Sequence, residues 1–287
     1  MKTKIIINPI SGTQKHRNIH KIFEKYLKNY EIVYTEYQNH AFEISKNLDE
    51  KFDRVIVAGG DGTINECVRG LIDKDVTLAT LPCGSGNGFS LHNKIDTNLD
   101  NAIKSIDSYK EIKSDVWTIN DIPFINVSGI GFDAMIANSF SKLKNRGFSS
   151  YIKLVLKNVI SYKPQKYNIE IDHKKINTDA FFIAFANASE YGNGAVISPK
   201  SNISDGLLDI IIVKKFNKFL IPKLIYYIFK KRIHKFSKVI IKQGKMISIV
   251  PSSKESYLVH LDGEPKKISG VLKIRKRKSK MKVLINE

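Results

Sequence analysis

Three glycine-rich segments and one acidic segment contain the residues whose types and spacing could do chemistry. The glycine-rich segments are "NPISG" at residues 8–12, "GGDGT" at 59–63 and "GSGNG" at 84–88. Glycines let bare backbone approach a ligand, and a helix that begins immediately afterwards adds unpaired N–H groups and the positive end of its dipole. Such loops can bind phosphate. The carboxylate of Asp61 would repel phosphate, unless a cation such as Mg²⁺ lies between them.

The alternative interpretation of the second loop is a tight turn, with Asp61 near the N-cap of a helix. A single glycine motif is a weak indicator, but three of them in one domain favour a ligand site. The sequence contains no GxxxxGK[ST] segment, which excludes a P-loop. It also contains no GxGxxG segment, so a dinucleotide fingerprint has little support.

The acidic segment is "HLDGEP" at residues 260–265. Asp262 and Glu264 lie two residues apart, so both would point to one side if the segment is extended. Beside a nucleotide-phosphate site, one carboxylate could accept a hydroxyl proton while the other holds a metal or orients its partner. A hairpin turn at Asp-Gly followed by a solvated glutamate explains the pattern equally well.

Other candidate metal ligands are sparse. In "SNISDGLLDI", residues 201–210, Asp205 precedes Gly206. A turn that leads into a strand is the favoured interpretation, although a carboxylate beside turn carbonyls could hold a hard cation. The histidines and the two cysteines, Cys67 and Cys83, show no zinc-binding spacing. The cysteines therefore predict free thiols in a reducing cytoplasm.

Hydrophobic patterning predicts the elements that position these segments. Up to about residue 115, apolar strand-like runs alternate with segments of helical spacing. The run at residues 54–60 is continuous, which is typical of a parallel strand buried on both faces. Repeated strand, loop and helix predict an open α/β sheet, in which the loops at the carboxyl ends of the strands converge on one crevice.

After Asp115 the pattern changes to strand-like segments separated by turn residues, beginning with residues 116–137. Two helices are predicted among them, at 149–161 and 218–231. Many strands with such punctuation favour a β-sandwich. The predicted fold is an N-terminal open α/β nucleotide-binding domain, residues 1–115, and a C-terminal β-sandwich domain, residues 116–278. Whether residues 279–287 complete the first domain is left open.

The charge balance predicts anionic partners. Lys and Arg number 47 against 28 Asp and Glu, a net charge of +19. Nucleic acid, acidic membrane lipid and nucleotides all fit this surplus. Residues 214–235 mix basic and apolar side chains, as a membrane-surface contact does, although a solvated face over a core helix is nearly as well supported. No nucleic-acid-binding motif occurs, so we expect no nucleic-acid partner.

The sequence also predicts where the protein works. Met1 leads almost directly into a strand-like run, so no signal peptide is expected, and no apolar run approaches the length of a membrane span. We therefore expect a cytoplasmic protein that associates peripherally with the inner face of the membrane.

The order of the motifs resembles the diacylglycerol kinase catalytic-domain family, which includes bacterial soluble lipid kinases and sphingosine and ceramide kinases. The resemblance rests on "INPISG", "GGDGTINE", "LPCGSGN", "GIGFDA", "SDGLLD" and "LDGEP", which begin at residues 7, 59, 81, 129, 204 and 261. "GGDGT" alone also occurs in NAD kinases and phosphofructokinases, so the combination carries the specificity. The resemblance implies an ATP-binding α/β domain and a lipid-binding β-sandwich domain. It implies an enzyme that transfers the γ-phosphate of ATP to a lipid hydroxyl, first of all diacylglycerol, to give phosphatidic acid.

The resemblance also implies roles for individual residues, with ATP and Mg²⁺ as cofactors. Asp262 would be the general base and Glu264 its metal-linked partner, or the reverse. Asp205, with the backbones of Asn202 and Leu207, matches a second metal site of the bacterial enzymes. Asp133 is a candidate contact to the lipid headgroup. The residues expected to line the ATP site are Asn8, Ser11, Thr35, Gly59, Gly60, Asp61, Gly62, Thr63, Asn65 and Ser85.

One position departs from the bacterial pattern. Bacterial diacylglycerol kinases usually have an aspartate after the asparagine of the third loop, whereas here Gly88 follows Asn87. The Ser85-Gly86-Asn87 form is more similar to the sphingosine kinase branch. Sphingosine or another long-chain base is therefore the alternative lipid. A soluble acceptor such as NAD, and a non-catalytic sensor on a kinase fold, are further alternatives. The expected partners are the membrane lipid substrate and an anionic membrane surface, and a homodimer is left open.

Overall fold

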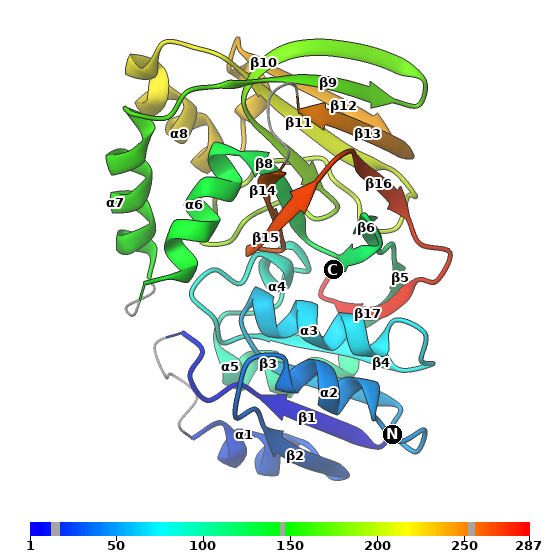
Figure 1. Cartoon of the computed structure of the whole chain (residues 1–287). Coiled ribbons are helices and arrows are strands. Elements are labelled where there is room, and N and C mark those ends of the chain that lie inside the picture. The colour runs from blue at the N-terminus through cyan, green and yellow to red at the C-terminus, as the bar shows by residue number, and fades with distance from the viewer. Residues whose placement is uncertain (13–17, 144–146, 252–255) are drawn as a thin grey trace.

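The structure is a computed structural model that describes residues 1–12, 18–143, 147–251 and 256–287. Two regions lie one above the other in Figure 1, an α/β region that contains both termini and a β-rich region. The first region is built mainly from the start of the chain, drawn in blue and cyan. The sites discussed below depend on segments from both regions.

The α/β region contains one mixed sheet with the strand order β2-β1-β3-β4-β17-β5. Strands β1 to β4 are parallel, and β17 is parallel to β4 but antiparallel to β5. The C-terminal strand thus lies between β4 and β5, so the chain returns to its first sheet after completing the second region. The strands are β1 (Thr3–Ile7), β2 (Tyr30–Tyr34), β3 (Arg54–Gly59), β4 (Thr77–Pro82), β5 (Lys110–Ser114) and β17 (Met281–Ile285).

Helices cover both faces of this sheet. Their bounds are α1 (Ile19–Tyr26), α2 (His40–Lys46), α3 (Asp61–Leu71), α4 (Gly88–His92), α5 (Leu99–Lys104) and the short helix η1 (Ile106–Ser108). In β3, Val55 and Val57 pack into the core that includes side chains of α2 and α3. Ile56 and Ala58 pack into the core that includes α1 and α5. Because alternate residues of a strand point to opposite faces, the uninterrupted apolar run is buried on both sides, as its sequence predicts.

The β-rich region is a large sheet ordered β15-β14-β8-β10-β9-β13-β16-β6-β7, with β11 paired to β10 and β12 to β11. One apolar core contains residues from strands near both ends of this order, such as Trp117 of β6 and Val259 of β14. The sheet therefore closes over itself as a β-sandwich-like layer, as predicted. Its strands are β6 (Trp117–Ile119), β7 (Ile122–Phe124), β8 (Val127–Gly131), β9 (Gln165–Ile171), β10 (Lys174–Ala186), β11 (Leu208–Lys214), β12 (Val239–Gly244), β13 (Met246–Pro251), β14 (Ser256–Leu261), β15 (Glu264–Ser269) and β16 (Leu272–Lys276).

The helices of this region partly contradict the sequence prediction. They are α6 (Phe132–Ser141), α7 (Phe148–Val159), α8 (Ile221–Phe229) and the short helices η2 (Lys218–Leu220) and η3 (Ile233–Lys235). The helices predicted near 149–161 and 218–231 are present. The strand predicted over 116–137 is wrong from Phe132 on, because Gly131 has φ +91° and directs the chain out of the sheet. None of the helices in the described parts of the chain is long and apolar enough to cross a membrane.

Candidate active site

The three glycine loops contact one another at the carboxyl ends of β1, β3 and β4. A Cβ atom on Gly84 would lie 2.4 Å from the Cα of Gly60, and one on Gly12 would lie 2.3 Å from the carbonyl oxygen of Cys83. Only glycine allows so close an approach of backbone to backbone. The Ser11 hydroxyl also donates to the Cys83 carbonyl at 3.2 Å. The loops therefore form one closely packed surface of partly buried backbone, at which peptide N–H groups could contact a ligand.

Polar side chains at the same edge link the strands to α3. The Asn8 side-chain amide donates to the Thr63 hydroxyl at 2.9 Å, which joins the end of β1 to the first turn of α3. The backbone N–H of Thr35 donates to the carbonyl of Ile7 at 2.9 Å, so buried Thr35 lies at this edge as well. Ser85 belongs to the third loop, where its carbonyl accepts a hydrogen bond of 2.7 Å from Asn193. All the residues proposed for the ATP site thus lie at one edge of the sheet or on the first turns of α3.

Asp61 caps the start of another helix. Its two carboxylate oxygens accept hydrogen bonds from the backbone N–H groups of Gly88 and Phe89, at 3.1 and 3.0 Å. These are unpaired N–H groups in the first turn of α4, where a negative charge is favourable. Burial raises the pKa of Asp61, and the hydrogen bonds oppose that change. The side-chain amide of Asn126 also donates to Oδ1 at 3.5 Å. A cation is therefore not required to explain an acid in this loop, although Oδ2 keeps a further lone pair.

Gly88 has a steric explanation. A Cβ atom at this position would lie 2.4 Å from the carbonyl oxygen of Glu190 and 2.8 Å from the side-chain nitrogen of Asn126. An aspartate, which the resemblance led us to expect here, would collide with both groups. The segment around Glu190 has taken the space that such a side chain would need.

The acidic segment is a hairpin turn, so the extended interpretation is wrong. Asp262 and Gly263 have φ angles of +49° and +88°, and they connect β14 to β15. A two-residue loop with two positive φ angles follows the twist of an antiparallel pair, and Asp-Gly is a preferred sequence for it. The turn nevertheless brings both carboxylates to the edge where the glycine loops meet.

Asp262 is buried, with 5% of its surface exposed, and is held by three donors. Its carboxylate accepts hydrogen bonds from the backbone N–H groups of Ile125 and Asn126, at 3.0 and 2.9 Å. The side-chain amide of Asn65 in α3 donates a third bond of 2.8 Å. Burial raises the pKa of Asp262 to about 6, although all three donors favour the charged form. This side chain is therefore fixed in place and has little freedom to contact a ligand.

Glu264 has the opposite environment. It begins β15 and is half-buried, and a Cβ atom on Gly62 would lie 2.9 Å from its Oε1 atom. The carboxylate therefore lies against the first turn of α3, where the helix dipole favours negative charge. In the part of the chain that the structure describes, no hydrogen-bond donor engages this carboxylate. Burial raises the pKa of nearby Glu66, and the charge of Glu264 adds to that increase.

The residues proposed for a second metal site lie in a separate cluster. Asp205 is exposed, and one of its oxygens accepts the N–H of Leu207 at 2.9 Å, while the side chain of Asn202 accepts from Ser204. Beside this loop, buried Asp115 accepts the N–H of Gly206 at 2.6 Å. Two lysines, Lys276 and Lys280, pair with the same carboxylate at 3.4 and 3.1 Å. The charge of Asp115 is thus balanced by two ammonium groups, and the metal site at Asp205 stays a prediction.

Asp133 does not face a ligand space. It is buried in the first turn of α6, where it accepts a hydrogen bond of 2.7 Å from the hydroxyl of Tyr191. Its same oxygen, Oδ2, lies 2.8 Å from Nε2 of His260. Both side chains contact Oδ2, and the residue is buried, so the structure gives the expected contact of Asp133 with a lipid headgroup no support, and that contact stays a prediction. Neither Tyr191 nor His260 was assigned a role from the sequence, and only His260 lies within a motif that could have indicated it.

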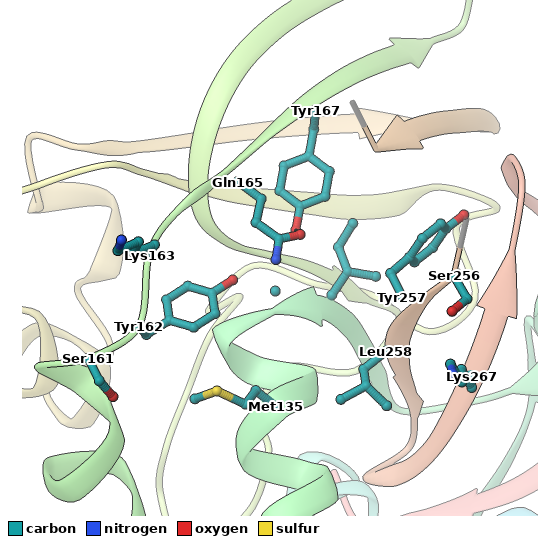
Figure 2. Close-up of a pocket in the computed structure, with 12 residues that line it drawn as sticks. Met135, Ser161, Tyr162, Lys163, Gln165, Tyr167, Ser256, Tyr257, Leu258 and Lys267 are labelled. Atoms are coloured by element: carbon teal, nitrogen blue, oxygen red, sulfur yellow. The ribbon is translucent and has the colours of Figure 1, made fainter. Parts of the chain in front are cut away.

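A cavity of about 470 Å³ opens in the β-rich region (Figure 2). Figure 2 shows Met135 of α6 and Leu258 of β14 along its lower side, with the rings of Tyr162, Tyr167 and Tyr257 above them. Lys163, Gln165 and Lys267 add polar groups. Leu258 pairs with Lys267 on the hairpin that ends at Leu261 and Glu264. Lys267 lies at the cavity and is three residues from Glu264 on β15. At about 3.3 Å per residue, the cavity is therefore roughly 10 Å from Glu264 along the strand.

Comparison with known proteins shows which family the chain resembles over both of its regions. Residues 2–119 match the diacylglycerol kinase catalytic domain, and residues 126–277 match the YegS C-terminal NAD kinase beta sandwich-like domain. A protein named "Probable lipid kinase YegS-like" from Shewanella frigidimarina is 33% identical over 62% of this chain and 60% of its own length. A similarly named protein from Chromohalobacter salexigens matches over 54% of its own length. The chain therefore spans less than two thirds of the length of each of these two relatives.

Two further relatives match more completely. A protein named "Diacylglycerol kinase" from Bacillus subtilis is 28% identical over 75% of each chain. A crystal structure described as that of a diacylglycerol kinase from Bacillus anthracis str. Sterne superposes with a TM-score of 0.74. It covers 99% of this chain and 97% of the other at 23% identity, which establishes the shared fold. By its two matched domains and their order, the chain belongs to the diacylglycerol kinase catalytic-domain family, in the form that has a YegS-type C-terminal domain.

Proposed function

We propose that this protein is a lipid kinase that transfers the γ-phosphate of ATP to a hydroxyl group of a membrane lipid, with diacylglycerol as the first candidate. The observation that carries this proposal is the meeting of Asn65, Asp262 and Glu264 beside the "GGDGT" loop. A phosphate-binding backbone and an accessible carboxylate lie at the same helix start. Phosphoryl transfer needs these two features in one place.

The glycine loops would bind the nucleotide. The backbone of residues 59–63 and of Ser85 and Gly86 and the positive end of α3 would supply N–H groups and a partial positive charge for phosphates. The N–H groups of Gly84 and Gly88 already donate to the side chains of Asn87 and Asp61. Asn8 and Thr63 hold the loops in position from the side. Nothing in this arrangement distinguishes ATP from another nucleoside triphosphate, so ATP is proposed from the family.

The acidic groups around the loops are suited to a Mg²⁺ ion carried by the nucleotide. Burial raises the pKa of Asp262 and of Glu190, and the negative charge of Asp61 adds to both increases. A cation would relieve this repulsion. Asp61, which is half-buried, would hold it with the remaining lone pair of Oδ2, and phosphate oxygens would supply other ligands. Mg²⁺ supplies charge neutralisation when it is bound. In the described residues, no three Cys, His, Asp or Glu side chains form a metal-binding group.

Glu264 is the better proton acceptor of the two acids. Its carboxylate is half-exposed and can reach a hydroxyl, whereas both oxygens of Asp262 are occupied by buried donors. Asp262 would instead orient the turn that presents Glu264. The sequence left these two roles interchangeable, and the different environments of the carboxylates support this order.

The lipid acceptor would extend from Glu264 into the cavity of Figure 2. The apolar side chains of Ile130, Met135 and Leu258 and the tyrosine rings suit hydrocarbon. A separation of roughly 10 Å along the β14–β15 hairpin leaves room for a polar headgroup between the cavity and the carboxylate.

The surface formed by α7, η2 and α8, which we call the helical face, would contact the membrane. The two segments touch where Phe148 packs edge-on against Phe229 and where Lys218 donates to the carbonyl of Ile160. Phe219 is 91% exposed and Ile160 is 75% exposed. Neighbouring large apolar side chains that are this exposed indicate a surface that binds a partner or a membrane.

The positive charge around the helical face favours an anionic bilayer as the surface that it binds. No aspartate or glutamate occurs in residues 134–169 or in residues 210–254, which contain α7 and α8, whereas both ranges contain many lysines. Each Lys or Arg near an acidic membrane surface contributes about 1 kcal/mol. A peripheral position at the inner face of the membrane is therefore part of this proposal.

A direct transfer assay tests the proposed function. Purified protein would be incubated with Mg²⁺, radiolabelled ATP and mixed micelles of diacylglycerol, and the lipid products would be separated by chromatography. Labelled phosphatidic acid is the expected product. A labelled long-chain-base phosphate, formed from sphingosine in parallel micelles, would instead support the alternative that Ser85-Gly86-Asn87 suggests. Label on NAD, or on no acceptor while ATP still binds, would contradict a lipid kinase.

A further inference from the structure

Both ring nitrogens of His260 are engaged in the interior of the protein. The side chain is 2% exposed and lies near the end of β14. Its Nε2 atom lies 2.8 Å from Oδ2 of Asp133. Its Nδ1 atom accepts a hydrogen bond of 3.2 Å from the backbone N–H of Gly263. The imidazole therefore bridges α6 and the turn that connects β14 to β15.

These partners select one tautomer of the ring. The N–H of Gly263 can only donate, so Nδ1 must carry a lone pair. In the neutral ring the proton is then on Nε2, which donates it to Asp133. The hydroxyl of Tyr191 donates to the same carboxylate oxygen at 2.7 Å. Asp133 thus accepts two hydrogen bonds and holds the imidazole in the orientation that Gly263 requires.

The surrounding backbone fits closely around the side chains of Asp133 and His260. Gly129 of β8 lies beneath them, and a Cβ atom there would lie 2.3 Å from Oδ2 of Asp133 and 3.0 Å from Nε2 of His260. Any side chain at residue 129 would displace the pair. The close fit makes the imidazole a rigid support.

The support acts on the residue that separates the two catalytic candidates. Gly263 lies between Asp262 and Glu264, and its peptide orientation determines where the following carboxylate points. Asp262 is anchored from one side by Asn65, Ile125 and Asn126. The bond from Gly263 to His260 anchors the turn from the other side.

We propose that His260 is a positioning residue for Glu264, held in its Nε2–H tautomer by Asp133. This inference rests on the proposed function, in which Glu264 accepts the proton of the lipid hydroxyl. The imidazole touches neither substrate nor nucleotide. It maintains the angle from which Glu264 meets the acceptor, and a misplacement of about 1 Å at such a position can lower the rate roughly 100-fold.

Two substitutions separate positioning from packing. In His260→Asn, the amide oxygen reaches the place of Nδ1 and can still accept the N–H of Gly263. In His260→Gln, the amide reaches the place of Nε2, which keeps the contact with Asp133 but leaves Gly263 without its acceptor. We expect His260→Asn to retain a kcat close to that of the wild type. We expect His260→Gln to lose kcat by roughly 10- to 100-fold with an unchanged KM for ATP.

Equal losses in the two variants, or a full kcat in His260→Gln, would overturn the proposal. Thermal unfolding of both variants would be recorded in parallel, so that a folding defect is separated from a change in kcat. An increase in the KM for ATP that accounts for the whole loss would also contradict a role in positioning Glu264.

A spectroscopic measurement tests the hydrogen bonds without any activity. In the protein with ¹⁵N-labelled histidine, the spectrum should show His260 as the Nε2–H tautomer, assigned by the signals that vanish in His260→Asn. Asp133→Asn should disturb this tautomer, and the amide proton of Gly263 should exchange faster in His260→Gln than in the wild type. The Nδ1–H tautomer would overturn the inference. If the wild-type protein has the Nε2–H tautomer but no lipid kinase activity, the proposed function is contradicted. Faster amide exchange at Gly263 in His260→Gln would then still show that His260 holds the turn, and unchanged exchange would show that it does not.

Discussion

The side-chain amide of Asn65 donates a hydrogen bond of 2.8 Å to the carboxylate of Asp262, across 197 residues of sequence. This bond connects α3, which begins within the "GGDGT" loop, to the turn between β14 and β15. It also lowers the pKa of a carboxyl group that burial raises to about 6. The pair therefore links the protonation of the turn to its position on the α/β region.

Loss of the Asn65 amide should move the acid limb of the pH–rate profile to higher pH. The wild-type rate should fall as the pH decreases through about 6, because protonated Asp262 can no longer accept from all three of its donors. In Asn65→Ala the pKa of Asp262 rises further, so the fall should begin at a higher pH. The kcat for lipid phosphorylation between pH 5 and 8 measures this. Asn101→Ala, at an exposed amide of α5, should leave the profile unchanged, and an unshifted limb in Asn65→Ala would contradict the argument.

Glu264→Gln should abolish most of the phosphoryl transfer while nucleotide binding persists. Glutamine keeps the shape of the side chain but cannot accept the hydroxyl proton as a base. General base catalysis contributes about 10²- to 10⁴-fold, and kcat should fall within this range. Calorimetric titration with ATP checks that binding is retained. Glu24→Gln, at an exposed position of α1, is the matched control. A kcat near that of the wild type in Glu264→Gln would return the role of base to Asp262.

Gly62→Ala should lower activity and raise stability in the same protein. A methyl group here would lie 2.9 Å from Oε1 of Glu264 and would push that flexible side chain away. Alanine within a helix is more favourable than glycine by roughly 0.5–1 kcal/mol. Denaturant unfolding and the transfer assay together measure the two opposite effects.

Gly70→Ala in the same helix is the contrasting control. Its Cβ atom would lie 2.6 Å from the side chain of Ser45 and 2.7 and 2.8 Å from backbone atoms of Lys46 and Phe42. Backbone cannot move aside as a side chain does, so this variant should be destabilised. A stabilised Gly70→Ala, or a fully active Gly62→Ala, would show that these contacts do not govern the site.

Phe219→Asp should weaken binding to acidic vesicles without changing phosphorylation of a water-soluble short-chain diacylglycerol. The phenyl ring is 91% exposed on the helical face, and burial of such a side chain contributes about 1.5–3 kcal/mol. The affinity for phosphatidylglycerol-containing vesicles, measured by co-sedimentation, should therefore decrease roughly tenfold or more. Met246→Asp, at an apolar residue of β13 that is 57% exposed, should bind as the wild type does. Equal weakening in both variants would indicate a general charge effect rather than a specific face.

Asp115→Ala should destabilise the protein more than Asp73→Ala does. Asp115 is fully buried and holds the N–H of Gly206 together with Lys276 and Lys280. Its removal leaves a buried donor unsatisfied, at a cost of about 1–3 kcal/mol. Asp73 forms a largely exposed pair with Arg277, for which a loss below about 1 kcal/mol is expected. Thermal unfolding of both variants measures this difference.

Several features could be predicted from the sequence because their causes are local. The apolar run before Gly59 makes a strand that is buried on both faces, and the glycines that follow it leave the backbone free for close contacts. Periodicity and the absence of a Cβ atom act over a few residues, so no knowledge of distant segments is needed. The sandwich-like second region also follows from repeated short strands and turns.

Other predictions failed or stayed open because their causes lie far away in the chain. The strand predicted through Phe132 gave way to a helix at Gly131, whose positive φ no pattern indicates. The N–H groups of the first turn of α4 explain an acid at Asp61 without a cation, and no pattern indicates this contact, so the sequence alone leaves the cation beside Asp61 a prediction. The position of Asp133 is filled by Tyr191 and His260, which come from other elements.

The sequence by itself determined the local shapes, namely which segments are strands, helices and bare loops, and it named the acids that could act. Only the tertiary structure distinguished the environments of the two acids. Asp262 and Glu264 are two residues apart, yet one is enclosed by donors from α3 and from Ile125 and Asn126, and the other remains half-exposed. The pKa and the reach of a carboxyl group depend on burial and on hydrogen-bond donors brought by packing. Those donors lie more than a hundred residues away from Asp262. Asn65 belongs to the "GGDGTINE" motif, but nothing in that motif indicates that its amide meets Asp262, and Ile125 and Asn126 lie in no motif.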